Sequence, residues 1–139
     1  MIKSYELDFC NLEIYKDYVL ATMHEGIVVS VKNNAILIKI AEMHFNNTPF
    51  VYITNRVNSY SVDPIVYIKT AKIPTLLGFA VVSKDPIQKT LTKYEKKFFT
   101  KEFKRFDDID SAIAWKDEMI KKYPYKLLTS RDKQKKSIK

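Results

Sequence analysis

The segment Pro49–Ser83, PFVYITNRVNSYSVDPIVYIKTAKIPTLLGFAVVS, predicts one complete βαβ unit. Its outer parts, Phe50–Thr54 and Leu76–Val82, are continuous apolar runs, as is typical of parallel strands that are covered on both faces. Between them, Asp63 and Pro64 predict the start of a helix, because aspartate is a good N-cap and proline suits the first helical position. We therefore expect the two strands to lie in the middle of a sheet.

The residues before this unit predict a meander followed by a helix. Apolar and polar residues alternate in Ser4–Phe9 and in Leu12–Met23, which is typical of half-buried strands, and Lys16–Asp17 predicts a tight turn. Ser30 then provides an N-cap, and the apolar residues after it have helical spacing. The pattern predicts a helix over about Val31–His44.

The residues after Ser83 predict another helix, a strand and a last helix. Asp85 and Pro86 repeat the cap-and-proline pattern, and Gln88 is expected to complete a capping box with Asp85. A short strand near Phe103–Phe106 then leads to Asp107, which we expect to cap the last helix. The residues expected to face the core from the first of these helices are Ile87, Leu91, Tyr94 and Phe98.

The predicted fold class is α/β, with a mixed β-sheet covered by helices in the order β-β-β-α-β-α-β-α-β-α. A chain of 139 residues with 46% hydrophobic residues can bury a core of its own. We expect one domain over residues 1–125, followed by a basic C-terminal tail over residues 126–139.

The sequence lacks the residues that several classes of function require. The single cysteine, Cys10, has no metal-ligand spacing, and His24 and His44 lack the motifs of metal or catalytic sites. Gly26 and Gly78 are the two glycines of the chain, so a glycine-rich phosphate loop is missing. We expect no enzyme activity, no metal and no cofactor. Three carboxylates are expected to favour a helix N-terminus instead of a metal: Asp107, Asp108 and Asp110.

The positive charge is concentrated in the C-terminal part. Residues 1–83 hold seven basic and seven acidic residues, whereas residues 84–139 hold seventeen and nine. This half could bind nucleic acid weakly, or it could be a solvated face with a solubilising tail. No apolar run has the length of a transmembrane segment, and the N-terminus lacks the pattern of a signal peptide, so we expect a cytoplasmic protein.

The sequence resembles the SpoIIAA-like proteins of the STAS/SEC14 type, in particular small uncharacterised bacterial members. The resemblance covers about residues 5–120, and its most specific part is Asn58–Pro64. It implies a compact α/β domain related to anti-sigma-factor antagonists, in which a loop serine is phosphorylated to control partner binding. The present loop departs from their Asp-Ser-Ser-Gly pattern and has no glycine. The resemblance rests on Tyr52–Arg56, Asn58–Pro64, Gly78–Ser83, Glu95–Phe99 and Phe106–Trp115.

The expected site is the polar loop Asn55–Ser61, because open α/β sheets bind ligands at the carboxyl ends of their strands. A phosphate on Ser59 or Ser61 would lie near a helix N-terminus, although these serines could also shape the turn. Asp63 and Pro64 are expected to cap the helix. The residues expected to bind a partner or a ligand are Asn55, Arg56, Asn58, Ser59, Tyr60 and Ser61.

The leading hypothesis is a non-catalytic protein-interaction or regulatory domain whose partner binds at this loop. Such a domain could also form a homodimer. The first alternative is a module that binds a small anionic or lipid-like ligand near residues 55–63. The second is weak nucleic-acid binding through the basic C-terminal half.

Overall fold

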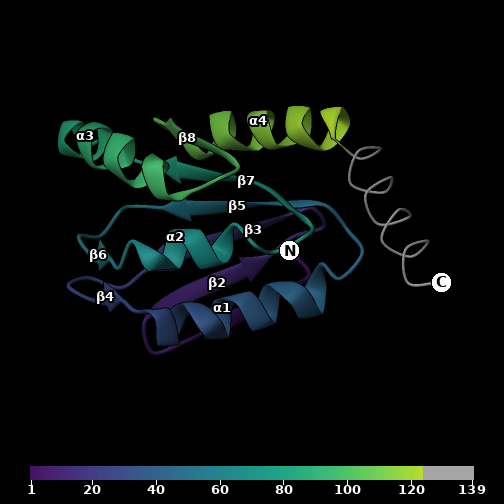
Figure 1. Ribbon diagram of the computed structural model, residues 1–139, viewed down its shortest axis with the longest axis horizontal. Coiled ribbons are helices and arrows are strands. Elements are labelled where there is room, and N and C mark those ends of the chain that lie inside the picture. Colours follow the sequence, from purple (N-terminus) through teal and green to yellow (C-terminus); the bar gives the residue numbers. More distant parts are fainter. Residues whose placement is uncertain (124–139) are drawn as a thin grey trace.

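A six-stranded mixed sheet forms the centre of the molecule (Figure 1). The structure, a computed structural model, describes residues 1–123. The first three strands form an antiparallel meander, and the last three continue the sheet in parallel from β3. Along the sheet the strands are β1 (Lys3–Glu6), β2 (Cys10–Ile14), β3 (Tyr18–Met23), β5 (Phe50–Asn55), β7 (Leu76–Val82) and β8 (Glu102–Phe106).

The order of the main elements confirms the predicted fold class. The two strands of the central βαβ unit, β5 and β7, are adjacent and lie inside the sheet, as expected. None of the helices in residues 1–123 is long and apolar enough to cross a membrane. The helices are α1 (Val31–His44), α2 (Ile65–Thr70), α3 (Pro86–Glu95), which continues into the 3-10 turn η1 (Lys96–Phe98), and α4 (Ile109–Lys122).

The helices cover the sheet on both faces and make two apolar cores. Alternate residues of a strand point to opposite faces, so Tyr52 joins one core and Ile53 the other. The larger core contains residues of α1 and α2, such as Leu37 and Tyr67. The smaller core is closed by α4, and Gly78 of β7 allows this helix to approach closely. A Cβ atom at Gly78 would lie 2.8 Å from the Trp115 side chain.

A second, two-stranded sheet was not predicted from the sequence. The strands β4 (Val28–Val29) and β6 (Ser61–Val62) pair in parallel and are too short to show an alternating pattern. The Asp63 N–H group extends this pairing by donating to the Val29 carbonyl at 3.0 Å. The chain between β5 and α2 is therefore attached to the segment that precedes α1.

Three expectations about helix ends can be compared with the structure. Ser30 caps α1, and Asn33 completes a capping box that we did not foresee. The cap of α4 is Asp108, so the assignment of Asp107 was wrong; the Asp107 side chain instead forms an ion pair with Arg105. The predicted end of the domain at residue 125 and the predicted tail over residues 126–139 lie outside the described residues.

Candidate functional site

Loop 55–61 begins at the carboxyl end of β5 and leads through β6 to α2. This is the position that the sequence predicted. Its polar groups hold it against the turn between β3 and β4. The Asn58 side-chain amide donates to the Met23 carbonyl at 2.9 Å, and the Ser59 N–H group donates to the Glu25 carboxylate at 2.7 Å. The loop therefore has a defined position, fixed by residues about 34 positions earlier in the chain.

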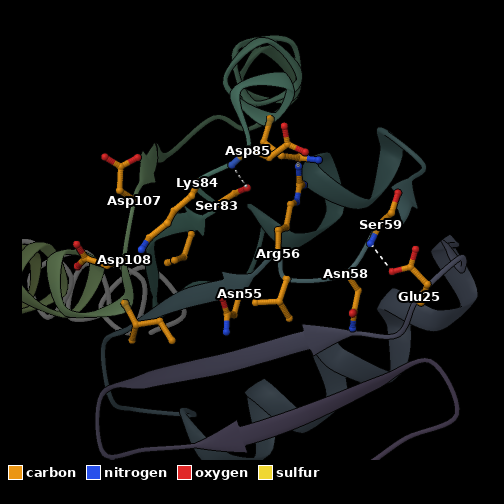
Figure 2. Close-up of a pocket in the computed structure, with 14 residues that line it drawn as sticks. Glu25, Asn55, Arg56, Asn58, Ser59, Ser83, Lys84, Asp85, Asp107 and Asp108 are labelled. Atoms are coloured by element: carbon orange, nitrogen blue, oxygen red, sulfur yellow. Dashed lines mark hydrogen bonds between the residues drawn. The ribbon is translucent and has the colours of Figure 1, made fainter.

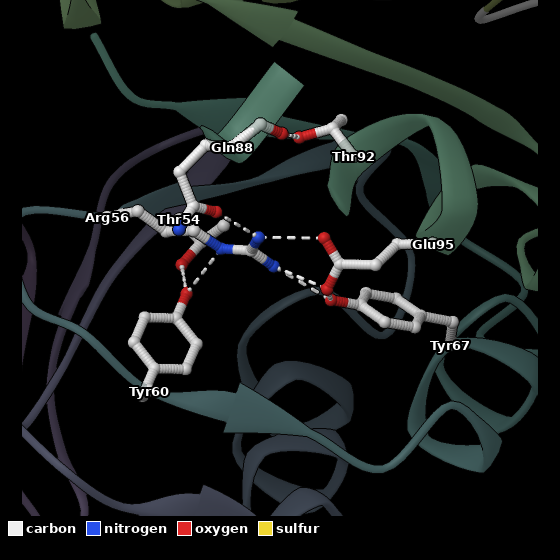
Figure 3. A network of polar contacts seen from close by, with 7 residues as sticks. All are labelled: Thr54, Arg56, Tyr60, Tyr67, Gln88, Thr92 and Glu95. Carbon is white, nitrogen blue, oxygen red and sulfur yellow. Dashed lines mark hydrogen bonds and ion pairs between the residues drawn. The ribbon is translucent and has the colours of Figure 1, made fainter. Parts of the chain in front are cut away.

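Figure 3 shows that Arg56 connects this loop to α2 and α3. A guanidinium group has five N–H donors, and Arg56 donates five hydrogen bonds. Nε donates to the Tyr60 hydroxyl. The other acceptors are the Gln88 side-chain oxygen, both oxygens of Glu95 and the Tyr67 hydroxyl, at 2.7–2.9 Å. Arg56 therefore has no spare donor with which to hold an anionic ligand.

The contact between Arg56 and Glu95 is a buried ion pair. Their side chains are 5% and 13% exposed, and the closest nitrogen and oxygen atoms are 2.7 Å apart. Burial alone would lower the pKa of Arg56, but the hydrogen bonds and charge of Glu95 raise it above its ordinary value. Burial also raises the pKa of Tyr67, whose hydroxyl donates to Glu95. The guanidinium and the phenol therefore keep their protons, and the network stays paired at neutral pH.

This network determines which side of α3 faces the rest of the domain. Three polar residues of α3 point inward, namely Gln88, Thr92 and Glu95, and we call them the polar side of α3. The expected capping box between Gln88 and Asp85 was wrong, because the Gln88 side chain accepts from Arg56 instead. Asp85 does cap α3, by accepting from the Ile87 N–H group.

The apolar residues of α3 point away from the core, which contradicts our expectation. Ile87, Leu91 and Tyr94 are 67%, 44% and 55% exposed, and we call them the apolar side of α3. Of the four residues predicted to face inward, Phe98 alone is partly buried against the larger core. The sequence contained a signal for the correct orientation. Gln88, Thr92 and Glu95 are spaced by four and three residues, so they share a helix face that can satisfy a buried arginine.

A crevice of about 630 Å³ lies beside loop 55–61 at the carboxyl ends of β5 and β7 (Figure 2). This is the place that the topology predicted. Asn55, Asn58 and Ser59 line it from the loop, and Lys84 lines it from the opposite side. Four carboxylates also line it: Glu25, Asp85, Asp107 and Asp108.

These carboxylates make the crevice unfavourable for an anion. The Arg105 side chain lowers the pKa of Asp107, and hydrogen bonds from Ser111 lower that of Asp108, so both are ionised at neutral pH. Ser59 and Ser61 are exposed, but a phosphate on Ser59 would lie beside the Glu25 carboxylate that accepts the Ser59 N–H group. Modification there would weaken the attachment of the loop to the β3–β4 turn.

Asp63 and Pro64 lie at the start of α2, as expected, although the helix begins one residue later than predicted. Pro64 occupies the cap position, and the Asp63 carboxylate accepts from the Ile65 N–H group at 3.1 Å. Ser61 belongs to β6, where its N–H group donates to the Ile27 carbonyl at 3.1 Å. These residues shape the entry into α2.

The other reactive side chains are engaged inside the fold. Cys10 is buried, and burial raises the pKa of its thiol to about 12, so little thiolate forms at neutral pH. The His44 ring is hydrogen-bonded to the Tyr5 hydroxyl, and the His24 ring to the Asp8 carbonyl. Within residues 1–123, no three His, Cys, Asp or Glu side chains are grouped so that they could hold a metal ion.

Comparison with known proteins shows the fold. No model of a protein family and no curated protein sequence matches the chain. A crystal structure of an uncharacterised protein of the DUF3478 family from Shewanella loihica PV-4, described as having a SpoIIAA-like fold, is similar. The TM-score is 0.54 at 17% sequence identity, and the match covers 76% of this chain and 90% of the other. The chain described above has a SpoIIAA-like fold, as the resemblance implied.

Proposed function

We propose that this SpoIIAA-like domain is a non-catalytic regulatory module that binds a protein partner through the apolar side of α3 and loop 55–61. The main observation is the exposure of Ile87, Leu91 and Tyr94 on a helix whose opposite side is fixed by a buried ion pair. Exposed apolar patches mark interaction sites, and residues spaced by four and three positions are typical anchors of helix-mediated recognition.

Helix α2 also exposes apolar residues. Ile65 and Ile68 of α2 are 48% and 41% exposed. Between α2 and α3 lies a hollow of about 180 Å³, lined in part by Pro64, Leu91 and Tyr94. This volume is smaller than the 300 Å³ or more that is typical of small-molecule sites. The hollow is therefore better suited to one side chain of a partner than to a whole lipid-like ligand.

The charge around the patch indicates the chemistry of the partner. Residues 84–98 contain five lysines and two acids, and one of these acids, Glu95, is turned inward onto Arg56. A second copy of this chain would bring lysines against lysines in a symmetric interface. We infer that the partner is a different protein, with an apolar contact surface that has acidic residues at its rim.

The fold is consistent with such a role. In the anti-sigma-factor antagonists that this sequence resembles, the domain binds partner proteins and the loop after the corresponding strand takes part in regulation. Loop 55–61 occupies the same place here and borders the hollow between α2 and α3 through Tyr60 and Ser61. The loop and the apolar side of α3 therefore belong to one binding surface.

The test uses the double variant Leu91→Ser/Tyr94→Ser and a matched control, Ile36→Ser/Met43→Ser, on the exposed side of α1. Proteins captured from cells by the wild type are identified, purified and titrated against all three proteins by calorimetry. We expect the α3 variant to bind the partner at least tenfold more weakly and the control to bind as the wild type does, with all melting temperatures within a few degrees.

An equal loss of affinity in both double variants would contradict the proposal, as would an α3 variant that binds like the wild type. A partner whose contact surface is basic would contradict the inferred charge.

A further inference from the structure

A third side of α3 carries lysines and borders a separate hollow. Lys89 and Lys93 of α3 and Lys96, the first residue of η1, are exposed and spaced by four and three residues. They lie in one row, which we call the lysine side of α3. They face β8, the last strand of the sheet. The row extends over about 10 Å, at a rise of ~1.5 Å per residue.

The hollow between the lysine side and β8 has a volume of about 390 Å³, within the size range of small-molecule sites. Within the described part of the chain, its lining contains the three lysines, Lys104 and Arg105, and includes no carboxylate. Among residues 1–123, none of these three lysines forms an ion pair with a carboxylate. This differs from the crevice at the carboxyl ends of β5 and β7, which is lined by four carboxylates.

The edge of β8 provides backbone donors at the same place. The Ser83 N–H group donates to the Phe106 carbonyl, so the N–H and carbonyl groups of Phe106 face β7. In a parallel strand this direction alternates, so the N–H and carbonyl groups of Phe103 and Arg105 face the outer edge of the sheet that residues 1–123 form. Both residues line the hollow. Ammonium groups and backbone N–H groups together are the donors that bind phosphate in proteins.

We propose that this hollow is a binding site for a ligand with several linked phosphate groups, held by Lys89, Lys93 and Lys96 and by the edge of β8. Arg105 lies beside them, with its side chain engaged by the Ser83 carbonyl and the Asp107 carboxylate. The row of lysines fits a chain of phosphates better than a single anion, because the positive charge is spread along the helix. Of the residues that the structure describes, one aromatic residue lines the hollow, Phe103, and it is buried. Bases therefore have no exposed ring on which to stack, which favours a small polyphosphate over single-stranded nucleic acid.

The site is separate from the surface assigned to the protein partner. The apolar side and the lysine side are two different faces of α3, offset by two positions in the sequence. Changing the apolar side should leave phosphate binding intact. The lysines also add to the positive charge around the apolar side, so the apolar-side variant, and not the lysine variant, separates the two proposals.

The test titrates inorganic tripolyphosphate into the full chain by calorimetry at about 0.15 M salt. The variant is Lys93→Gln/Lys96→Gln, and the matched control is Lys32→Gln/Lys39→Gln, which removes two exposed lysines from α1. We expect the α3 variant to bind at least tenfold more weakly and the control to change affinity less than twofold. The Leu91→Ser/Tyr94→Ser variant should bind like the wild type.

Further arms identify the source of the phosphates. Binding to vesicles containing phosphatidylinositol bisphosphate, but not to phosphatidylcholine vesicles, with displacement by tripolyphosphate, would assign a lipid headgroup. Tripolyphosphate binding without vesicle binding would assign a soluble ligand.

Three results would overturn the proposal. The first is no binding of tripolyphosphate or of the phosphoinositide vesicles at millimolar phosphate. The second is an equal loss in the α1 and α3 variants, which would show that net charge alone is responsible. The third is a single-stranded oligonucleotide that binds at least a hundredfold more tightly than tripolyphosphate and is displaced by the same lysine changes.

Discussion

The helices α1 and α3 both contain apolar residues at helical spacing, yet they bury opposite kinds of residue. In α1, Leu37 and Ile40 face the larger core. In α3, the polar side faces inward and the apolar side is exposed. The difference comes from what lies beneath each helix: mainly the apolar side chains of the larger core under α1, where Asn34 is the one buried polar residue, and the guanidinium of Arg56 under α3. The environment of a helix, and not its apolar pattern alone, decides which side is buried.

The largest effect is expected from Arg56→Met. This change leaves the Glu95 carboxylate buried without its cation, and breaking one partner of a buried pair typically costs about 3–5 kcal/mol. The free energy of unfolding, measured with urea, should fall by about this amount. As a control, Arg105→Met removes an ion pair whose Asp107 partner is 68% exposed and a hydrogen bond to the Ser83 carbonyl, and it should cost clearly less than Arg56→Met.

The double variant Arg56→Met/Glu95→Leu sharpens this comparison. It removes both charges of the buried pair, so it should recover part of the loss caused by Arg56→Met. If the two single arginine variants lose the same stability, Arg56 does not organise α3.

Two leucine truncations compare the helices directly. Leu37→Ala in α1 removes a buried side chain and should lower the free energy of unfolding by about 2–5 kcal/mol. Leu91→Ala in α3 removes a side chain that is 44% exposed and should change it by only about 0.5 kcal/mol. Urea unfolding of both variants measures the difference. A larger loss for Leu91→Ala would show that α3 packs its apolar side against the core.

A smaller effect concerns Lys101, which follows η1 and attaches this end of the α3 region to the core. Its ammonium nitrogen donates to the Ile73 and Leu76 carbonyls at 2.6 and 2.7 Å, and burial lowers its pKa from 10.5 to about 8. Between pH 8 and 10.5 the unfolded chain binds more protons at this lysine than the folded chain. Lys101 therefore makes stability rise with pH in this window.

Cys10 acts in the opposite direction above about pH 9, because burial raises its pKa from 9.0 to about 12. The stability of the wild type should therefore be compared with that of Lys101→Met, which retains Cys10. The difference should shift in favour of the wild type from pH 8 to 10. Its slope should stay below about 1.4 kcal/mol per pH unit, because Lys101 is partly exposed. A difference that is constant over this range would refute the lowered pKa.

Most of the fold follows from patterns in the sequence. The apolar runs of β5 and β7 fix the centre of the sheet, and Ser30 with the spacing after it predicts the bounds of α1 that the structure shows. The strands β4 and β6 could not be predicted, because two residues have no period and their pairing depends on distant parts of the chain. Local patterns thus predict long elements, and tertiary contacts decide short ones.

The position of the candidate site could be predicted from the sequence, but the contacts of its residues could not. The topology places loop 55–61 beside a crevice, as expected from the end of a central strand. The burial of Arg56 depends on Glu95, which lies 39 residues later, and local spacing does not show such a pair. Polar residues at helical spacing, such as Gln88, Thr92 and Glu95, can form the buried face of a helix when an arginine follows a buried strand.

The orientation of α3 is tested most directly by the reactivity of single cysteines at neighbouring positions. Wild-type Cys10 is fully buried and provides the unreactive baseline. In Leu91→Cys and Thr92→Cys, labelling with a thiol reagent at low protein concentration reports which side of the helix meets solvent. We predict that Leu91→Cys reacts nearly as fast as a free thiol and that Thr92→Cys is protected at least tenfold. A protected Leu91→Cys with a reactive Thr92→Cys would contradict the account.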